Sequence, residues 1–366
     1  MNIAYLYQKN DPYIEGRIKY LEEKGHRIYK LTYGSSQNYF TQTGIINFNL
    51  SDQYPFFALF FKRLVHLSEI SRFCKNYHID ILHIGNMLSI FYLMSTGSKL
   101  KIIENEGTDV LRTPKEYNLL GWIYRIFYPF TNAVLQDSSI AKNAGLFYGA
   151  PSFNNKIIRF GVDFRRFNPN IIKGICRKEI NALNNKIIFC SRGHKDLYNL
   201  DIIIKSIPMV IEKCPNARFV FACLKKGFQE KYNDLIKQLN VEDKIIIVNQ
   251  LDHESKMPFY CCDADIVVSI PSSDSSPLSV YEAMACKTPV IISDLPWYHE
   301  LFVKDRDVVV VPVRNVEKFA GKVIEVINGD KKINLELAYE KVFNYLNYKT
   351  ENRKLEKFYK GILKNV

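Results

Sequence analysis

The chain has 366 residues, 47% hydrophobic and 24% charged, which is the balance of a globular protein rather than a disordered or fibrous one. With 50 basic against 38 acidic side chains its net charge is +12, which favours anionic partners unless it reflects a biased composition alone. No apolar run reaches the roughly 18 residues of a membrane-spanning helix, and the N-terminus lacks the basic region and cleavage site of a signal peptide, so neither an integral membrane protein nor a secreted one is expected.

The first half of the chain alternates short apolar runs with amphipathic segments. The apolar runs predict strands at 2–7, 27–33, 44–48, 79–84, 100–105, 132–136 and 156–160. Amphipathic segments at 13–24 and 117–131 predict helices between them, and Gly25 is placed to end the first. Because the runs are apolar throughout rather than alternating, they are typical of buried parallel strands.

The second half repeats this pattern. Strands are predicted at 186–191, 217–223, 244–248, 264–270, 288–292 and 307–311, with helices such as 197–213 and 227–240 between them. The polar stretch 161–185 is expected to connect two domains, and 333–366 to be helical. Strands alternating with helices imply right-handed crossovers and parallel sheets. We therefore expect an α/β protein of two Rossmann-like, doubly wound domains, with its chemistry in a cleft at the carboxyl ends of the strands.

The most informative segment, 264–286, reads as a strand, a small polar loop and a helix. Ser275 or Ser276 is expected to cap the helix, with Pro277 in its first turn. The amides and dipole at a helix start form an anion site, which suits a diphosphate. Asp274 lies just before the helix and Glu282 two turns inside it, so both carboxylates are expected to accept hydrogen bonds from the hydroxyls of one ligand.

An acid, seven residues and then Glu282-Ala283-Met284-Ala285 resembles the Glu-x7-Glu signature of the retaining glycosyltransferase family four, which has the GT-B fold. Three further stretches agree with that family in order and spacing: Glu106-Gly107-Thr108-Asp109, Phe160-Gly161-Val162-Asp163 and Thr288-Pro289-Val290-Ile291. The resemblance extends over nearly the whole chain. It departs at Lys287, which stands where the family usually has a helix-ending glycine.

The resemblance implies an acceptor-side domain at 1–165, a nucleotide-sugar donor domain at 166–345, and a C-terminal helix at 346–366 that packs back on the N-terminal domain. It implies a retaining hexosyltransferase that moves a sugar from a nucleotide-diphosphate sugar to a glycan or lipid-linked acceptor, in surface polysaccharide or glycolipid biosynthesis. No cofactor, divalent metal or nucleic acid is expected. The expected location is the cytoplasm, or the anionic inner face of the cytoplasmic membrane.

The same resemblance assigns roles to particular residues. The catalytic residues would be Arg192, Lys195, Asp274 and Glu106, and the donor would contact Ser276, Pro277, Leu278, Ser279, Glu282 and Asp109. The family usually has a lysine five or six residues after the arginine, where Leu197 and Tyr198 stand, so whether Lys195 or Tyr198 takes its place stays open. Glu106 stands at a family histidine, and either accepts a hydrogen bond from the donor or only caps structure.

Other interpretations remain at this point. A sugar-nucleotide epimerase shares the fold, and a nucleotide-binding scaffold with a decayed site would explain the missing lysine. Asp263-Ala264-Asp265 mimics a metal-binding motif but leads into a buried strand. His83 either faces the cleft or is a core histidine. The segment 56–77 combines aromatic and basic residues, so it is either a core helix or a helix at an anionic bilayer surface.

Cysteine usage points to a reducing compartment. The eight cysteines are scattered and form no Cys-x-x-Cys pair. In a chain without an export signal, this predicts reduced thiols and no zinc site.

Overall fold

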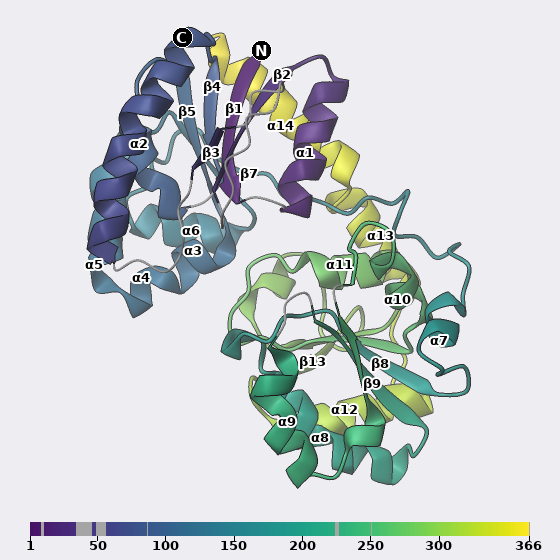
Figure 1. The fold of residues 1–366 in the computed structure, drawn as a ribbon. Coiled ribbons are helices and arrows are strands. Elements are labelled where there is room, and N and C mark those ends of the chain that lie inside the picture. The colour runs from purple at the N-terminus through teal and green to yellow at the C-terminus, as the bar shows by residue number, and fades with distance from the viewer. Residues whose placement is uncertain are drawn as a thin grey trace. The chain divides into compact units, whose positions relative to one another are not determined.

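The computed structural model describes residues 1–8, 11–33, 46–48, 56–85, 87–223, 227–249 and 251–365 (Figure 1). These residues form two compact units. Unit 1 comprises Met1–Phe160 and Lys349–Val366, and unit 2 comprises Gly161–Tyr348. The chain therefore passes between the two units after residues 160 and 348. The sequence analysis placed these boundaries after residues 165 and 345.

In its described part, unit 1 is built on seven parallel strands in the order β3-β2-β1-β4-β5-β6-β7. The strands are β1 (Asn2–Gln8), β2 (Arg27–Tyr33), β3 (Ile46–Phe48), β4 (Ile81–Ile84), β5 (Leu100–Asn105), β6 (Ala133–Gln136) and β7 (Asn155–Ile157). Every residue of β4 and β6 is buried, and all but His83 and Gln136 are apolar, as expected for parallel strands covered on both faces.

Helices flank this sheet, with α2 on one side and α1 and α14 on the other (Figure 1). They are α1 (Pro12–Glu23), α2 (Phe56–Asn76), α3 (Gly107–Leu111), α4 (Thr113–Glu116), α5 (Asn118–Phe127), α6 (Ser139–Phe147) and α14 (Tyr348–Leu363), with 3-10 turns η1 (Met87–Met94) and η2 (Tyr128–Phe130). Asp11 caps α1 by accepting from the amides of Tyr13 and Ile14. Gly25 follows the helix with a φ of 79°, as its predicted role at the helix end requires.

The C-terminal helix α14 packs on unit 1, as expected. The Tyr359 hydroxyl lies 2.8 Å from the hydroxyl of Tyr5 and also hydrogen-bonds Nδ1 of His83. His83 is fully buried and its Nε2 lies 3.1 Å from Glu104 Oε2, so His83 is a core histidine. Burial lowers its pKa, because the charged imidazolium loses its hydration.

Unit 2 contains, in its described part, a sheet of six parallel strands in the order β10-β9-β8-β11-β12-β13. The strands are β8 (Lys186–Cys190), β9 (Ala217–Cys223), β10 (Ile245–Asn249), β11 (Ile266–Ser269), β12 (Val290–Ser293) and β13 (Val309–Val311). Both units therefore have the doubly wound α/β architecture that the sequence predicts.

The helices of unit 2 lie on both faces of its sheet, with α8, α9 and α12 on one side and α10 and α11 on the other (Figure 1). They are α7 (Ile175–Glu179), α8 (Leu200–Lys213), α9 (Phe228–Gln238), α10 (Met257–Asp263), α11 (Leu278–Ala285), α12 (Val316–Asn328) and α13 (Leu335–Tyr345), with 3-10 turns η3 (Asp196–Tyr198), η4 (Glu242–Lys244) and η5 (Pro296–Glu300). The helical C-terminal region that the sequence predicts is formed by α13 and α14.

The two passages between units run side by side. Val162 N donates to Leu346 O at 2.7 Å, and Tyr348 N donates to Val162 O at 3.0 Å. Gly161 has a φ of 76°, and a Cβ there would lie 2.7 Å from Tyr348 N. Only glycine fits both the left-handed backbone and this close approach.

The segment 56–77 forms α2, which ends at Asn76. The side chains of residues 56–65, which include most of its aromatic residues, lie outside the described residues. Farther along, Ile70, Phe73 and Cys74 are buried in the core of unit 1. The half of α2 whose side chains are described is thus a core helix. Among the described residues, no helix is both long and apolar enough to cross a bilayer.

Candidate active site

Two adjacent parallel strands of unit 2 bring Arg192 and Asp274 together. Arg192 follows β8 and Asp274 lies in the loop after β11, and these strands pair directly. The Arg192 guanidinium forms an ion pair with the Asp274 carboxylate, and its Nε donates to Ser269 Oγ at 2.8 Å. Both charged side chains are only 16% exposed. A cation is therefore held in place at the carboxyl edge of the sheet.

Tyr198 lies beside this arginine. Its ring centre is 5.2 Å from the Arg192 guanidinium carbon, a cation–π distance. Lys195 is exposed and makes no ion pair with the described part of the chain. Of the two residues left open for the missing lysine, Tyr198 is thus in contact with Arg192, and it supplies an aromatic face rather than a charge.

The start of α11 differs from the sequence prediction. The helix begins at Leu278 with Pro277 as its N-cap, and neither Ser275 nor Ser276 caps it. The reason is local, because the Asp274 carboxylate accepts from Ser275 N at 2.8 Å and Pro277 takes the extended cap conformation. The first-turn amides of Leu278 and Ser279 have no acceptor within the helix, so an anion-binding helix start remains.

Glu282 is buried in α11 and faces His253. Its side chain is 4% exposed, and Oε1 lies 2.8 Å from His253 Nε2. The other carboxylate oxygen, Oε2, is buried and has no hydrogen-bond partner in the described part of the chain. His253 also packs against Phe167, with ring centres 5.8 Å apart.

The sequence analysis did not include His253. One signal was available, because His253 follows β10 by four residues. It therefore lies past the carboxyl end of a parallel strand, as Arg192 and Asp274 do, which is where ligands are expected.

Glu106 and Asp109 lie in unit 1, at the start of α3 directly after β5. Glu106 is the N-cap residue but makes no side-chain capping bond, whereas Asp109 Oδ2 accepts from Met87 N at 3.1 Å. Burial raises the pKa of Asp109 to about 6. Burial, together with the nearby Asp109 charge, raises the pKa of Glu106 well above its usual value. Both environments favour the protonated acid.

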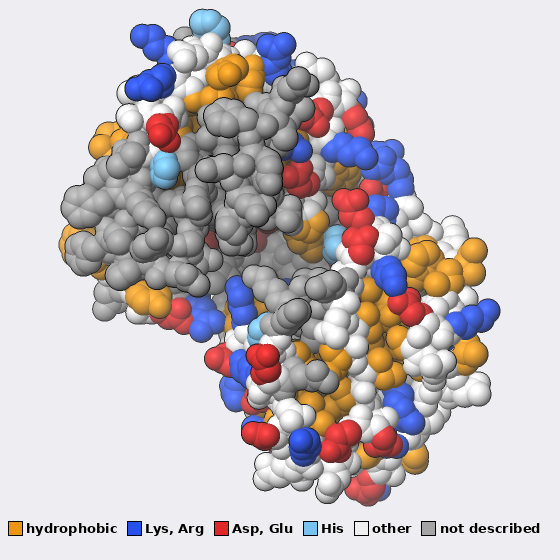
Figure 2. All heavy atoms as spheres, in the orientation of Figure 1, with side chains coloured by type: hydrophobic (Ala, Val, Ile, Leu, Met, Phe, Trp, Pro, Cys, Tyr) orange, Lys and Arg blue, Asp and Glu red, His pale blue; other side chains and the backbone are white. Residues whose placement is uncertain are grey.

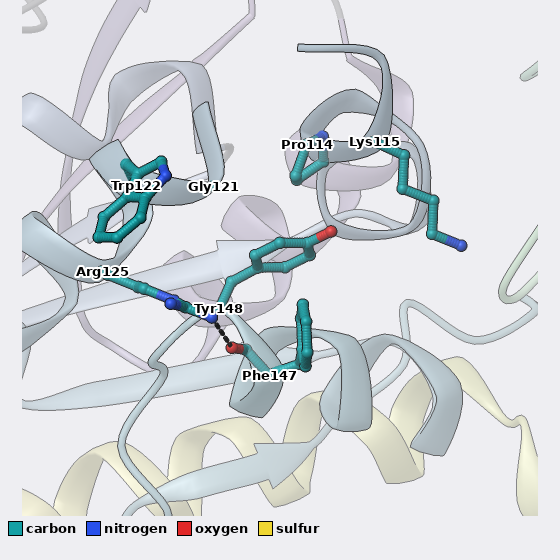
Figure 3. Close-up of a pocket in the computed structure, with 7 residues that line it drawn as sticks. All are labelled: Pro114, Lys115, Gly121, Trp122, Arg125, Phe147 and Tyr148. Atoms are coloured by element: carbon teal, nitrogen blue, oxygen red, sulfur yellow. Dashed lines mark hydrogen bonds between the residues drawn. The ribbon is translucent and has the colours of Figure 1, made fainter. Parts of the chain in front are cut away.

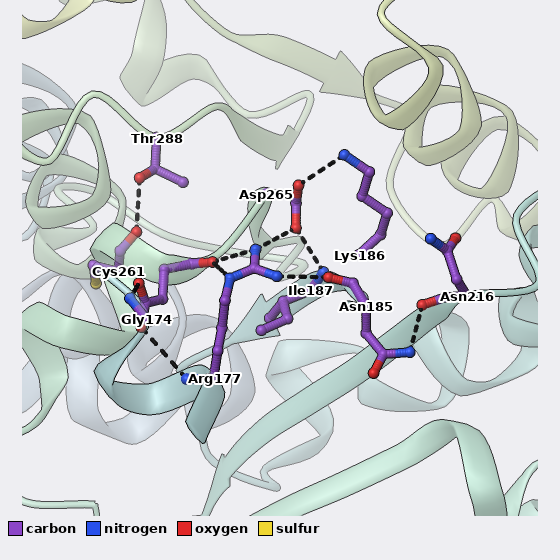
Figure 4. Close-up of polar contacts among 10 residues, drawn as sticks. Gly174, Arg177, Asn185, Lys186, Ile187, Asn216, Cys261, Asp265 and Thr288 are labelled. Atoms are coloured by element: carbon purple, nitrogen blue, oxygen red, sulfur yellow. Dashed lines mark hydrogen bonds and ion pairs between the residues drawn. The ribbon is translucent and has the colours of Figure 1, made fainter. Parts of the chain in front are cut away.

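The Asp263-Ala264-Asp265 motif lies at the opposite, amino end of β11. Asp263 accepts from the amides of Gly174 and Cys176, at 2.5 and 2.9 Å. Asp265 binds Arg177 Nη2 at 2.7 Å and Lys186 Nζ at 3.2 Å (Figure 4). These carboxylates fasten the segment around α7 to the sheet, and the described residues contain no group of three or more side chains suited to hold a metal ion.

Charge and cysteine placement bear on the remaining predictions. Lys and Arg side chains are scattered among Asp and Glu over the visible face of unit 2, rather than gathered in one basic field (Figure 2). The side chains of seven of the eight cysteines are described, and all seven are buried free thiols.

Comparisons with known proteins agree with this architecture. Residues 176–340 match the family model for glycosyl transferases group 1. The chain is 22% identical over 310 residues to alpha-monoglucosyldiacylglycerol synthase of Streptococcus pneumoniae, covering 77% of this chain and 67% of the relative.

Two solved structures show the same fold. Sucrose-phosphate synthase from Thermosynechococcus elongatus superposes with a TM-score of 0.83 at 15% identity, covering both chains in full. HepE from Anabaena, in complex with UDP and glucose, superposes with a TM-score of 0.77 at 14% identity, covering 98% of each chain. Both units of the chain therefore have counterparts in these structures.

Proposed function

We propose that this chain, a glycosyltransferase with the GT-B fold, transfers a hexose with net retention from a nucleoside diphosphate sugar to a glycan or lipid-linked acceptor. The reaction would serve surface polysaccharide or glycolipid assembly at the cytoplasmic face of the membrane. The observation that carries the proposal is the Arg192–Asp274 pair beside the start of α11, at the carboxyl edge of the unit 2 sheet.

Arg192 suits the chemistry of the leaving group. When the bond between the sugar C1 and the phosphate oxygen breaks, its electron pair leaves with the diphosphate and positive character remains on the sugar. A fixed guanidinium and the first-turn amides of Leu278 and Ser279 would stabilise this negative charge as it develops. Because Ser269 and Asp274 already hold the guanidinium, little reorganisation is needed at the moment of reaction.

The carboxylates suit the hydroxyls of the donor. Asp274 is half-buried next to Arg192, where it would accept from a sugar hydroxyl. Glu282 keeps Oε2 available as an acceptor while His253 binds Oε1. A ribose diol presents the O–H donors that a buried, unpartnered carboxylate oxygen requires.

Glu106 would take the place of the family's histidine by forming a hydrogen bond with the donor sugar. A neutral histidine can donate a hydrogen bond through its ring N–H, and a protonated carboxyl can donate in the same way. The raised pKa of Glu106 therefore supports its use in place of histidine. Asp109 and Ser276 would complete the contacts to the donor, with Lys195 reaching the diphosphate from its exposed loop.

The comparisons support the choice of donor and acceptor classes. The structure of HepE holds UDP and glucose, and the curated relative is named for a product made of glucose and diacylglycerol. We propose that the reaction needs no divalent metal, because Arg192 supplies a fixed positive charge for the diphosphate.

The test uses the full chain and a panel of nucleoside diphosphates and sugar nucleotides. Ligands that bind the folded state raise its melting temperature, so a thermal-shift screen identifies the donor. Mass spectrometry of the products then separates glycosyl transfer from epimerisation of the donor, NMR of the anomeric proton reports retention, and chelation with EDTA reports any metal requirement. Turnover without transfer, or no binding of any sugar nucleotide, would refute the proposal.

Variants locate the site. Arg192→Ala is expected to weaken binding of the nucleoside diphosphate by about tenfold or more while leaving the affinity for the nucleoside unchanged. Arg165→Ala is the matched control, because Arg165 is a 62% exposed arginine of the same unit. Asp274→Ala and Glu282→Ala are expected to abolish transfer. If the nucleoside alone lost as much affinity as the diphosphate in Arg192→Ala, the phosphate role would be wrong.

A further inference from the structure

Helix α5 of unit 1 is apolar on two faces. Leu120, Tyr124 and Phe127 are buried in the core. Leu119, Trp122 and Ile126, spaced by three and four residues, share another face of the helix and are 57%, 65% and 59% exposed. A surface helix normally places polar residues on its outward face, so this stripe calls for an explanation.

The exposed stripe continues around a pocket. The pocket has a volume of about 540 Å³ and opens between α4, α5 and the end of α6 (Figure 3). Its lining consists of Pro114, Lys115, Gly121, Trp122, Arg125, Phe147 and Tyr148. Phe147 is 68% exposed, so two large aromatic side chains, Trp122 and Phe147, project at the pocket.

Arg125 is fixed between these aromatic side chains. Its guanidinium carbon lies 5.7 Å from the ring centres of both Trp122 and Phe147, and its Nη2 donates to Phe147 O at 3.3 Å (Figure 3). Lys115, on the other side of the pocket, is exposed and forms no ion pair with the described residues. The pocket therefore presents one oriented cation, Arg125, and one exposed cation, Lys115.

The stretch of chain that contains α5, residues 117–136, carries positive charge alone. Between Glu116 and Asp137 the sequence contains no acidic residue, and Arg125 is the one charged residue there. Glu116 itself is taken up by an ion pair with Arg112. An apolar, aromatic surface with unopposed cations matches a partner that is both apolar and anionic.

We propose that the α5 surface, formed by Leu119, Trp122, Ile126 and Phe147 with Arg125 and Lys115, docks on the headgroup region of a bilayer that contains anionic lipid. Tryptophan and other aromatic side chains favour the boundary between headgroups and acyl chains. Lysine and arginine gain further attraction from the negative surface potential.

The pocket offers room for one lipid headgroup phosphate between Arg125 and Lys115. This inference deepens the proposed location at the membrane face, and it does not depend on the donor site. It concerns a surface of unit 1 other than the 56–77 segment.

The protein carries its own reporter for the test. It contains two tryptophans, of which Trp122 is 65% exposed and Trp297 is 4% exposed. Vesicles of phosphatidylglycerol and phosphatidylcholine are added to the full chain. We expect Trp122 emission to shift to the blue, brominated lipid to quench it, and the protein to sediment with the vesicles. Vesicles of pure phosphatidylcholine are expected to bind far less.

Two double variants separate the apolar and charged contributions, and a third serves as the control. The double variant Trp122→Ser, Ile126→Ser is expected to bind anionic vesicles more weakly, by about tenfold or more, as measured by sedimentation. Ile172→Ser with Leu183→Ser, at exposed apolar positions of unit 2, is the matched control and should sediment like the wild type. Arg125→Gln with Lys115→Gln is expected to remove the preference for anionic vesicles.

Binding of UDP, followed by thermal shift, is measured in each variant. Unchanged binding shows that the variants are folded and separates failure of this inference from failure of the proposed function. The inference is overturned if wild-type protein ignores anionic vesicles, or if the unit 2 control loses as much binding as the α5 variant. It is also overturned if Ile126→Ser instead dissociates a dimer, because the surface would then join two copies of the chain.

Discussion

His253 Nε2 lies 2.8 Å from Glu282 Oε1, although the two residues come from different elements of unit 2. The histidine follows β10, whereas the glutamate sits inside α11, where its side chain is almost fully buried. The oxygens of a buried carboxylate need hydrogen-bond partners. His253 supplies one, and in doing so it fixes which oxygen of Glu282 is left for a ligand.

We predict that His253→Phe weakens donor binding more than it slows turnover. Phenylalanine keeps the ring contact with Phe167 but removes the hydrogen bond, so Glu282 loses its orientation. A hydrogen bond to a charged group contributes about 1.5–3 kcal/mol, which corresponds to an increase in KM for the sugar nucleotide of about tenfold or more. Steady-state kinetics check this, with His253→Gln as the partner variant, because its amide can donate. A loss of kcat of the same size, with KM for the sugar nucleotide unchanged, would contradict a positioning role.

The buried ion pair of unit 1 is the basis of a second prediction. Arg17 Nη1 lies 2.5 and 2.6 Å from the two carboxylate oxygens of Glu104, and both residues are at most 2% exposed. Glu104→Gln would leave a buried guanidinium without its counter-charge, which costs about 3–5 kcal/mol. Urea denaturation measures the loss. The exposed pair of Arg112 and Glu116 is the control, since Glu116→Gln should cost less than about 1 kcal/mol.

The cost of Glu104→Gln should also depend on pH. Burial alone would raise the pKa of Glu104, but Arg17 and His83 outweigh burial and lower the pKa to about 2. A lowered folded-state pKa gives stability that is present above the unfolded value and is lost as the pH falls through the folded one. The difference between wild type and variant is thus expected to be constant above pH 5 and to shrink toward pH 2. A difference that grew in acid would be inconsistent with this ion pair.

Asp109 is expected to change stability with pH in the opposite direction. Burial raises its pKa to about 6, from an ordinary value of 3.8. Between these values the folded state holds a proton that the unfolded chain releases, so stability falls as the pH rises, and the full penalty is present above pH 6. Asp109→Asn removes the penalty and can still accept from Met87 N. We expect the melting temperature of Asp109→Asn to exceed that of the wild type at pH 8. At pH 3.5 we expect the two melting temperatures to be equal.

Asp163 provides a control of opposite direction. Its partial burial would raise its pKa, but the Arg165 guanidinium and the Arg165 amide lower it overall. Asp163→Asn is therefore expected to lose stability relative to wild type at pH 8. If both asparagine variants shifted in the same direction, charge would not be the cause.

Burial made much of the fold predictable from the sequence. The bounds predicted for β5 and β9 agree with Leu100–Asn105 and Ala217–Cys223, because largely buried parallel strands leave largely apolar runs. The meeting of Arg192 with Asp274 also followed from topology, since both come after neighbouring strands. The catalytic and donor-binding roles of these residues remain predictions.

Features that depend on tertiary contacts were missed. The sequence favoured Ser275 or Ser276 as the cap of α11, but it gives no sign that Asp274 accepts the Ser275 amide instead. Segment 117–131 was correctly predicted as helical, yet it is apolar on two faces, so its pattern does not reveal that Trp122 is exposed. The pairing of His253 with Glu282 joins residues 29 apart through the packing of α11.

Lys287 leads to the last prediction. It follows α11 with a φ of 55°, in the left-handed region that favours glycine, so the lysine itself ends the helix where the related family has glycine. Its Nζ lies 2.5 Å from Glu336, and both Lys287→Gly and Lys287→Ala remove that exposed ion pair. They differ in the Cβ atom, which costs about 1 kcal/mol in this conformation. Lys287→Gly is therefore expected to be more stable than Lys287→Ala by about 1 kcal/mol in urea denaturation, and equal stability of the two variants would show that the backbone relaxes away from the left-handed region.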